Sequence, residues 1–203
     1  IGLPTAATGV LFIVVYVVVG RTASAFGTAA LAALGLGFRV ESWLYMLGVG
    51  FGAAAAAVVG QNLGARRVDR AERAGWAMLG TATVPAVFAA AASPLVPEAM
   101  AGVFTSDAGV IAETARYLRI AAVSQLVVCA EVVLEGALGG AGATVAPMVA
   151  STTFTVARIP LATWAGAAFG PIGLWWVISA TATLRGLAMM ALWRTGRWKR
   201  NVV

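Results

Sequence analysis

Six ionisable side chains lie inside apolar stretches of this 203-residue sequence, where no connecting loop explains them. They are Arg39, Glu41, Glu131, Glu135, Arg158 and Arg185. On insertion scales, a charged side chain at the centre of a bilayer costs about 2.5 to 3.5 kcal/mol. We therefore expect these groups to face one another or a water-filled cavity, where they could form ion pairs, bind a cation or exchange a proton.

The spacing of the acids leads to two different expectations. Arg39 and Glu41 are two residues apart, so they point to different sides of a helix and each needs a partner on another helix. Glu131 and Glu135 are four residues apart and share a face, so their carboxylates are expected to repel each other and to titrate as a unit. In the alternative interpretation, the two arginines of the last apolar stretches neutralise the glutamates as static ion pairs.

The composition removes most other chemistry. The chain has no histidine, a single cysteine at Cys129 and only two aspartates, Asp69 and Asp107, both in polar stretches. Intramembrane zinc proteases, Ser-His hydrolases and aspartyl pairs within the bilayer are thereby excluded, and the chain cannot form an internal disulfide. We expect no enzyme activity, no bound metal and no cofactor.

The elements that must position the six charges are membrane-spanning helices. Hydrophobic residues make up 61% of the chain and charged residues 11%, which is less than half the roughly 25% of a soluble domain. Mean hydropathy is +0.90. Charged or turn-rich breaks separate six apolar windows: residues 4–20, 28–59, 76–92, 117–138, 147–169 and 172–193. The sequence therefore predicts an all-α, polytopic membrane helix bundle of about six spans, with the lipid bilayer as its first partner.

The loop charges predict an orientation. Four arginines between residues 66 and 73 follow the second window, and four bases between residues 194 and 200 follow the sixth. Segment 93–113, on the opposite side, has three acids and no base. By the positive-inside rule, both termini are then cytoplasmic in a multi-pass protein of the cell (inner) membrane. Because the last basic run follows a span and lies beside Trp193 and Trp198, it indicates an interfacial anchor rather than a nucleic-acid partner.

Two aromatic residues lie deeper in the second window. Trp43 and Tyr45 could stack on an aromatic or cationic compound, but packing in the core is the interpretation that we favour from sequence.

Several segments, in this order along the chain, resemble the MATE (multidrug and toxic compound extrusion) family. The first is Phe38-Arg39-Val40-Glu41-Ser42, followed by Val59-Gly60-Gln61-Asn62-Leu63-Gly64-Ala65 and Arg70-Ala71-Glu72-Arg73-Ala74. The similarity continues through Tyr117-Leu118-Arg119-Ile120, Gly136-Ala137-Leu138-Gly139-Gly140 and Arg158-Ile159-Pro160-Leu161-Ala162. The order and spacing of these segments resemble the second half of such a transporter over nearly the whole chain.

This resemblance implies a two-lobed secondary transporter of twelve helices, with the substrate in a cavity between the lobes. Residues 1–203 would form a single six-helix lobe, the C-terminal one, and the N-terminal six-helix lobe would be a missing partner. The first residue is Ile1 rather than methionine, which also suggests a piece of a longer product. Such transporters export small organic, often cationic, compounds in exchange for H⁺ or Na⁺, so the resemblance implies that an ion is coupled, with Glu131, Glu135 and then Glu41 as its candidate carriers.

Two other functions stay open at the level of sequence. One is a lipid-linked oligosaccharide flippase of similar architecture. The other is a helical membrane module that transports nothing, in which the intramembrane charges are structural pairs.

Overall fold

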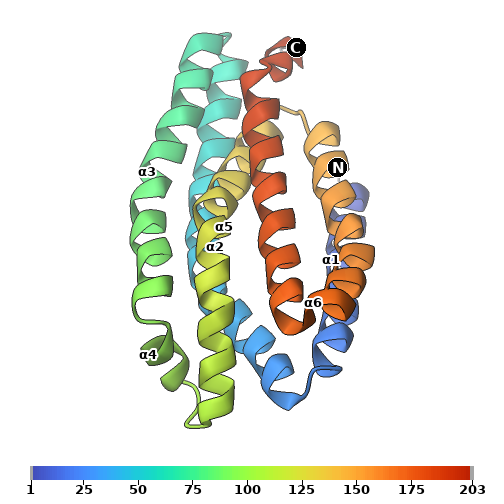
Figure 1. The fold of residues 1–203 in the computed structure, drawn as a ribbon. Coiled ribbons are helices and arrows are strands. Elements are labelled where there is room, and N and C mark those ends of the chain that lie inside the picture. The colour runs from blue at the N-terminus through green and yellow to red at the C-terminus, as the bar shows by residue number, and fades with distance from the viewer. Residues whose placement is uncertain (1, 202–203) are drawn as a thin grey trace.

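The chain folds into a bundle of long helices (Figure 1). The structure is a computed structural model that describes the backbone of residues 2–201 and the side chains of residues 9–200. The helices are α1 (Gly2–Ser24), α2 (Thr28–Gly64), α3 (Val68–Leu95), the short α4 (Pro97–Gly102), α5 (Ala108–Gly140) and α6 (Val145–Arg194), followed by the 3₁₀ turn η1 (Arg197–Asn201). Residues 2–201 contain no strand, and the predicted all-α class is confirmed.

Helix α6 contains two of the predicted spans. Its backbone breaks at Gly170, where φ is 66° and ψ is −153°, a region open essentially to glycine alone, and Pro171 follows. The orange and red halves of α6 consequently run in opposite directions (Figure 1). Four helices, α2, α3, α5 and α6, are long and apolar enough to cross a membrane, and α1 adds a shorter apolar stretch. With α6 counted as two segments, each of the six predicted windows lies in a helix of its own.

Helix α5 lies at the centre of the bundle and packs against α2, α3 and α6. Small residues allow α2 and α5 to cross closely. A Cβ atom on Gly136 would collide with the backbone of Gly52, and one on Gly140 would collide with the backbone of Ala56. Such small residues at every fourth position are typical of tight helix packing in membranes. This crossing fixes how the charged residues of α5 face their neighbours.

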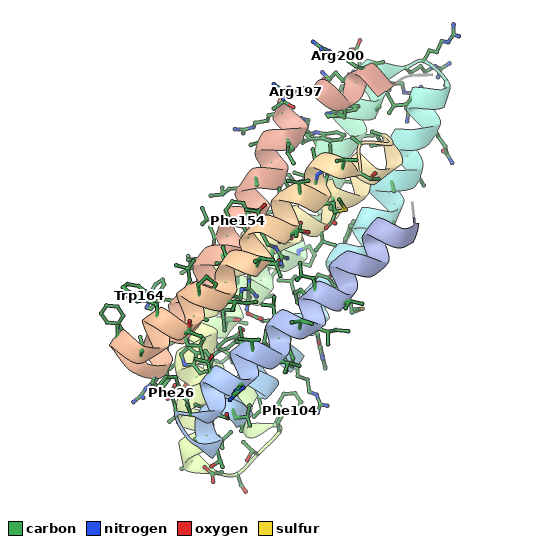
Figure 2. All side chains as sticks on the ribbon, turned by 90° about the vertical axis from the view of Figure 1, so that its right-hand side faces the viewer. Phe26, Phe104, Phe154, Trp164, Arg197 and Arg200 are labelled. Carbon is green, nitrogen blue, oxygen red and sulfur yellow. The ribbon has the colours of Figure 1, made fainter. Side chains whose placement is uncertain are left out.

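The two ends of the bundle differ in charge. The α2–α3 turn and η1 carry the two basic clusters, and an ion pair of 2.6 Å between Glu72 and Lys199 places them at the same end. Arg197 and Arg200 lie at this end, and Phe26 and Phe104 lie at the other (Figure 2). At the opposite end, the Asp107 carboxylate caps α5 by accepting a hydrogen bond of 2.9 Å from the Val110 amide. The end of the bundle that holds the α2–α3 turn and η1 is called the basic end below.

Candidate functional site

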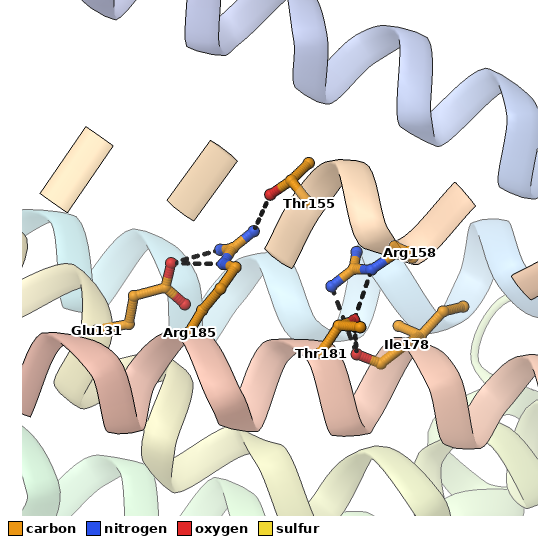
Figure 3. Close-up of polar contacts among 6 residues, drawn as sticks. All are labelled: Glu131, Thr155, Arg158, Ile178, Thr181 and Arg185. Carbon is orange, nitrogen blue, oxygen red and sulfur yellow. Dashed lines mark hydrogen bonds and ion pairs between the residues drawn. The ribbon is translucent and has the colours of Figure 1, made fainter. Parts of the chain in front are cut away.

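A buried ion pair between Glu131 and Arg185 is the centre of the intramembrane charge cluster (Figure 3). Glu131 comes from α5 and its side chain is 2% exposed, whereas Arg185 comes from the second half of α6. Arg185 donates from Nε to Glu131 Oε1 over 2.8 Å, and its Nη2 forms an ion pair with the same oxygen at 2.5 Å. The other oxygen, Oε2, is buried and has no hydrogen-bond partner among the described residues. One oxygen of this carboxylate is therefore buried without a hydrogen-bond donor among the described residues.

The first half of α6 joins the same cluster through hydroxyl and carbonyl groups. Arg185 Nη1 donates to Thr155 Oγ1 over 3.2 Å. Arg158, 5% exposed, donates from Nε to Thr181 Oγ1 over 2.8 Å and from Nη2 to the Ile178 carbonyl over 3.4 Å (Figure 3). The two arginines thus connect the two antiparallel halves of α6 to each other, and Arg185 connects them to α5.

The structure pairs one of the two arginines with a glutamate and leaves the other without a carboxylate partner among the described residues. Arg185 neutralises Glu131, but Arg158 has no carboxylate within 4.0 Å among residues 9–200. Glu41 and Glu131 are nevertheless within range to interact electrostatically with Arg158. The guanidinium of Arg158 is a buried charge that only neutral dipoles contact directly.

Glu41 finds its partner on another helix, as its spacing from Arg39 predicts. Glu41 Oε2 accepts a hydrogen bond of 3.0 Å from the Tyr117 hydroxyl of α5. Gly37, one turn before Glu41, leaves the space that the Tyr117 ring fills. Arg39 points elsewhere: it is exposed, and its guanidinium makes no hydrogen bond within the described part of the chain. The structure thus separates Arg39 from the charge cluster.

Glu131 and Glu135 do not form the shared buried pair that their spacing predicts. Glu131 is buried and Glu135 is exposed on the surface of the bundle. Four residues advance an α-helix by about 400°, so Glu135 is turned by about 40° from Glu131, which places it at the edge of the helix contact. The expectation that both carboxylates share one low-dielectric wall is corrected accordingly.

The sequence interpretation missed the uncharged partners in the cluster. Thr155 lies three residues before Arg158, and Thr181 lies four residues before Arg185, so each hydroxyl shares a helix face with an arginine. That spacing is visible in the sequence, but the hydrogen bonds run crosswise, from Arg185 to Thr155 and from Arg158 to Thr181, and they depend on how the two halves of α6 pack together. Tyr117 has no such local signal, because its partner is 76 residues away. The described residues also contain no group of three or more His, Cys, Asp or Glu side chains that could hold a metal ion.

Comparisons with known proteins connect this arrangement to a family of membrane proteins. The MatE family model matches residues 4–164. The probable multidrug resistance protein NorM of Deinococcus radiodurans is 31% identical over 96% of this chain and 45% of its own length. The multidrug resistance protein NorM of Burkholderia vietnamiensis is also 31% identical, over 96% of this chain and 43% of its own. The chain thus spans less than half the length of these curated relatives.

Solved structures agree on the fold. A crystal structure of MATE in the straight conformation superposes with a TM-score of 0.89 at 18% identity, covering 99% of this chain and 46% of that one. A MOP superfamily transporter from Pyrococcus furiosus, described as having a binding pocket of reverse polarity, gives a TM-score of 0.83 at 18% identity. That comparison covers 92% of this chain and 42% of the other.

Proposed function

This chain belongs to the MatE family of membrane transporters, and from that membership we propose that it forms the C-terminal lobe of a two-lobed multidrug antiporter. The observation that carries the proposal is the match to NorM proteins along 96% of this chain but only 45% or less of their length. Secondary transporters place their substrate site at the interface of two repeats, and one six-helix lobe supplies one wall of such a site. The NorM relatives also favour drug export over the oligosaccharide flippase and the non-transporting module.

In this proposal, the full transporter exports small organic, often cationic, compounds across the cell (inner) membrane in exchange for H⁺ or Na⁺. The candidate ion carriers in this lobe are Glu131, Glu135 and Glu41. Glu131 is supported by its free, buried Oε2 and by Arg185, which the carboxylate can hold or release as its charge changes. Glu41 is supported by its hydrogen bond to Tyr117, and Glu135 by its open position one turn beyond Glu131.

The coupling role can be tested in the two-lobed protein with Glu131→Gln, Glu135→Gln and Glu41→Gln variants, each reconstituted in liposomes. We expect Glu131→Gln to reduce drug-driven proton or sodium movement by at least tenfold while the protein is still produced and folded. Glu72→Gln is the matched control, because Glu72 is an acid at the basic end that pairs with Lys199. Unchanged ion coupling in all three intramembrane variants would assign the ion site to the other lobe.

We also propose that the basic end faces the cytoplasm. Ala65 lies in the α2–α3 turn at the basic end, Ser106 lies before α5 at the other end, and both are exposed. In a Cys129→Ala background, an impermeant maleimide added outside intact cells should label Ser106→Cys and leave Ala65→Cys unlabelled. The reverse labelling pattern would invert the proposed topology.

A further inference from the structure

The net positive charge of the chain belongs entirely to the basic end. Eight of the fourteen lysine and arginine residues lie in the α2–α3 turn, the start of α3, the end of α6 and η1, together with only two of the eight acids, Asp69 and Glu72. The other six bases and six acids of the chain cancel, so this end carries the whole formal charge of +6. A surface with such a charge attracts the headgroups of anionic phospholipids.

Buried tryptophans hold the C-terminal bases beside α3. Trp198 of η1 is 2% exposed, its ring stacks on Trp193, and its Nε1 donates to the Trp193 carbonyl over 2.9 Å. Trp193 fills the space beside Gly75 of α3, and Lys199 pairs with Glu72 of the same helix. Both tryptophans therefore pack inside the lobe, and the charged groups that can reach lipid at this end are arginines.

Two of these arginines lie at the ends of apolar faces on neighbouring helices. On α3 and on the second half of α6, exposed residues recur at every third or fourth position, which is one side of a helix. Along α3, this side consists of Arg73, Ala77, Gly80, Val84 and Phe88. Along α6, it consists of Arg194, Ala191, Leu187 and Leu184. An exposed apolar side of a membrane-spanning helix contacts acyl chains, so each arginine lies at the level of the headgroups above them.

Trp76 brings the two arginines together. The guanidinium carbon of Arg194 lies 5.8 Å from the centroid of the Trp76 ring, and Trp76 follows Arg73 by three residues, so the two are neighbours on the surface of α3. Arg73 Nε donates to the Asp69 carbonyl over 3.3 Å. Neither arginine has a carboxylate within 4.0 Å among residues 9–200. Two uncompensated guanidinium groups thus lie beside one indole.

The exposed aromatic residues of α2 do not make a comparable site. Trp43 is 74% exposed and Tyr45 is 44% exposed, so the expectation that both pack in the core is wrong. Arg39 precedes Trp43 by one turn and is also exposed. The chain outside the basic end has equal numbers of acids and bases, however, so an anionic headgroup gains no net attraction there.

We propose that Arg73 and Arg194, held beside Trp76, bind an anionic phospholipid, with its phosphodiester between the two guanidinium groups and its acyl chains along the apolar sides of α3 and α6. Arginine donates paired N–H groups to phosphate oxygens, and such charge-assisted hydrogen bonds are stronger than neutral ones. A zwitterionic phospholipid offers the same phosphodiester but adds a cation that the surrounding charge of +6 repels. A soluble anion would leave the apolar sides unused. This lipid site does not depend on the transport function proposed above.

Binding can be measured by native mass spectrometry of the purified 203-residue chain in a nonionic detergent, titrated with phosphatidylglycerol or with phosphatidylcholine of the same acyl chains. We expect the parent chain to bind phosphatidylglycerol at least tenfold more tightly than phosphatidylcholine. Arg73→Gln and Arg194→Gln should each weaken phosphatidylglycerol binding by at least tenfold, as expected for a lost hydrogen bond between charged groups. Both side chains are exposed, so the variants should stay folded, which circular dichroism can check.

Arg67→Gln is the matched control, because Arg67 is an exposed arginine of the α2–α3 turn that lies on neither apolar side. Its loss removes the same charge and should weaken binding by no more than about fivefold, the share of one base in the general attraction to anionic lipid. An equal loss in all three variants would overturn the proposal, because the attraction would then be diffuse. Equal affinity of the parent chain for the two lipids would overturn it as well.

Two further measurements exclude other occupants of this surface. Glycerol phosphate has the anion without the acyl chains and should not displace phosphatidylglycerol at equal concentration. Displacement would identify a site for soluble anions and contradict the proposal. The differences between Arg73→Gln, Arg194→Gln and Arg67→Gln should also hold in the two-lobed protein. Their disappearance there would show that the other lobe covers this surface, and the lipid site would be wrong.

Discussion

The Glu131–Arg185 pair allows a test of how much a buried charge contributes to this bundle. Arg185→Met keeps a side chain of similar length and removes every donor from the Glu131 carboxylate, whose Oε2 already has none. Breaking a buried pair by removing one partner costs about 3 to 5 kcal/mol, compared with about 0 to 1 kcal/mol for an exposed pair. Glu131 is 2% exposed and Arg185 is 13% exposed, so we expect about 3 kcal/mol.

The expected loss can be measured by thermal unfolding of the purified chain, followed by tryptophan fluorescence. For a chain of this size, 1 kcal/mol corresponds to about 2 to 4 °C in Tm, so Arg185→Met should lower Tm by about 6 to 12 °C. Glu131→Leu should cost less, because Arg185 keeps Thr155 and partial exposure. The double variant should return to within about 1 kcal/mol of the parent, since it leaves no unpaired charge.

The reasoning would be refuted by either of two results. If Arg185→Met changed Tm by less than about 2 °C, the pair would behave as a solvated surface contact. If the double variant lost as much stability as the two single variants together, the two side chains would not be energetically coupled. The short contact between them in the structure would then be wrong.

Three further predictions follow from other parts of the bundle. Gly140→Leu should destabilise the fold by about 1 to 3 kcal/mol through overpacking, because a side chain at this position meets the α2 backbone. Gly139→Leu is the control, because a side chain there has open space, and size-exclusion chromatography and Tm should distinguish the two variants. Trp198→Ala should cost about 3 to 5 kcal/mol in a denaturant titration, because its ring is buried and stacks on Trp193 with 4.2 Å between the ring centroids. Glu98 should have a pKa below its ordinary 4.5, because a backbone amide hydrogen bond and Arg119 stabilise its carboxylate. Its contribution to folding stability is therefore fully present above pH 4.5 and is lost as the pH falls through the lowered pKa. A ¹³C NMR titration would contradict this last prediction if Arg119→Gln left the pKa of Glu98 unchanged.

The six spans could be predicted from the sequence because they follow from composition and local order. A run of about 20 apolar residues must satisfy its own backbone hydrogen bonds in a bilayer, so it must be a helix wherever its neighbours lie. The break at Gly170 and the cap at Asp107 also depend on residues close in sequence. The family resemblance is likewise a property of the sequence, because it rests on short segments in a fixed order.

Only the tertiary structure decided which intramembrane charges meet. Arg158 and Arg185 have the same chemistry and lie in equally apolar stretches, yet only Arg185 reaches a carboxylate. The difference depends on how closely the two halves of α6 approach α5, and the small residues of α5 and α6 set that distance. Gly186, next to Arg185, packs directly against the backbone of α5 at Val127.

The exposure of Glu135 and Trp43 could not be predicted from the sequence either. Each lies in an apolar span at a position where helical periodicity alone predicts burial as readily as exposure. Hydropathy cannot separate a core face from a lipid-facing or cavity-facing one in a membrane protein, because both faces are apolar. The sequence by itself therefore determined the helices and the charges that they carry, and the packing of α5 against its neighbours decided which of those charges are paired and which are not.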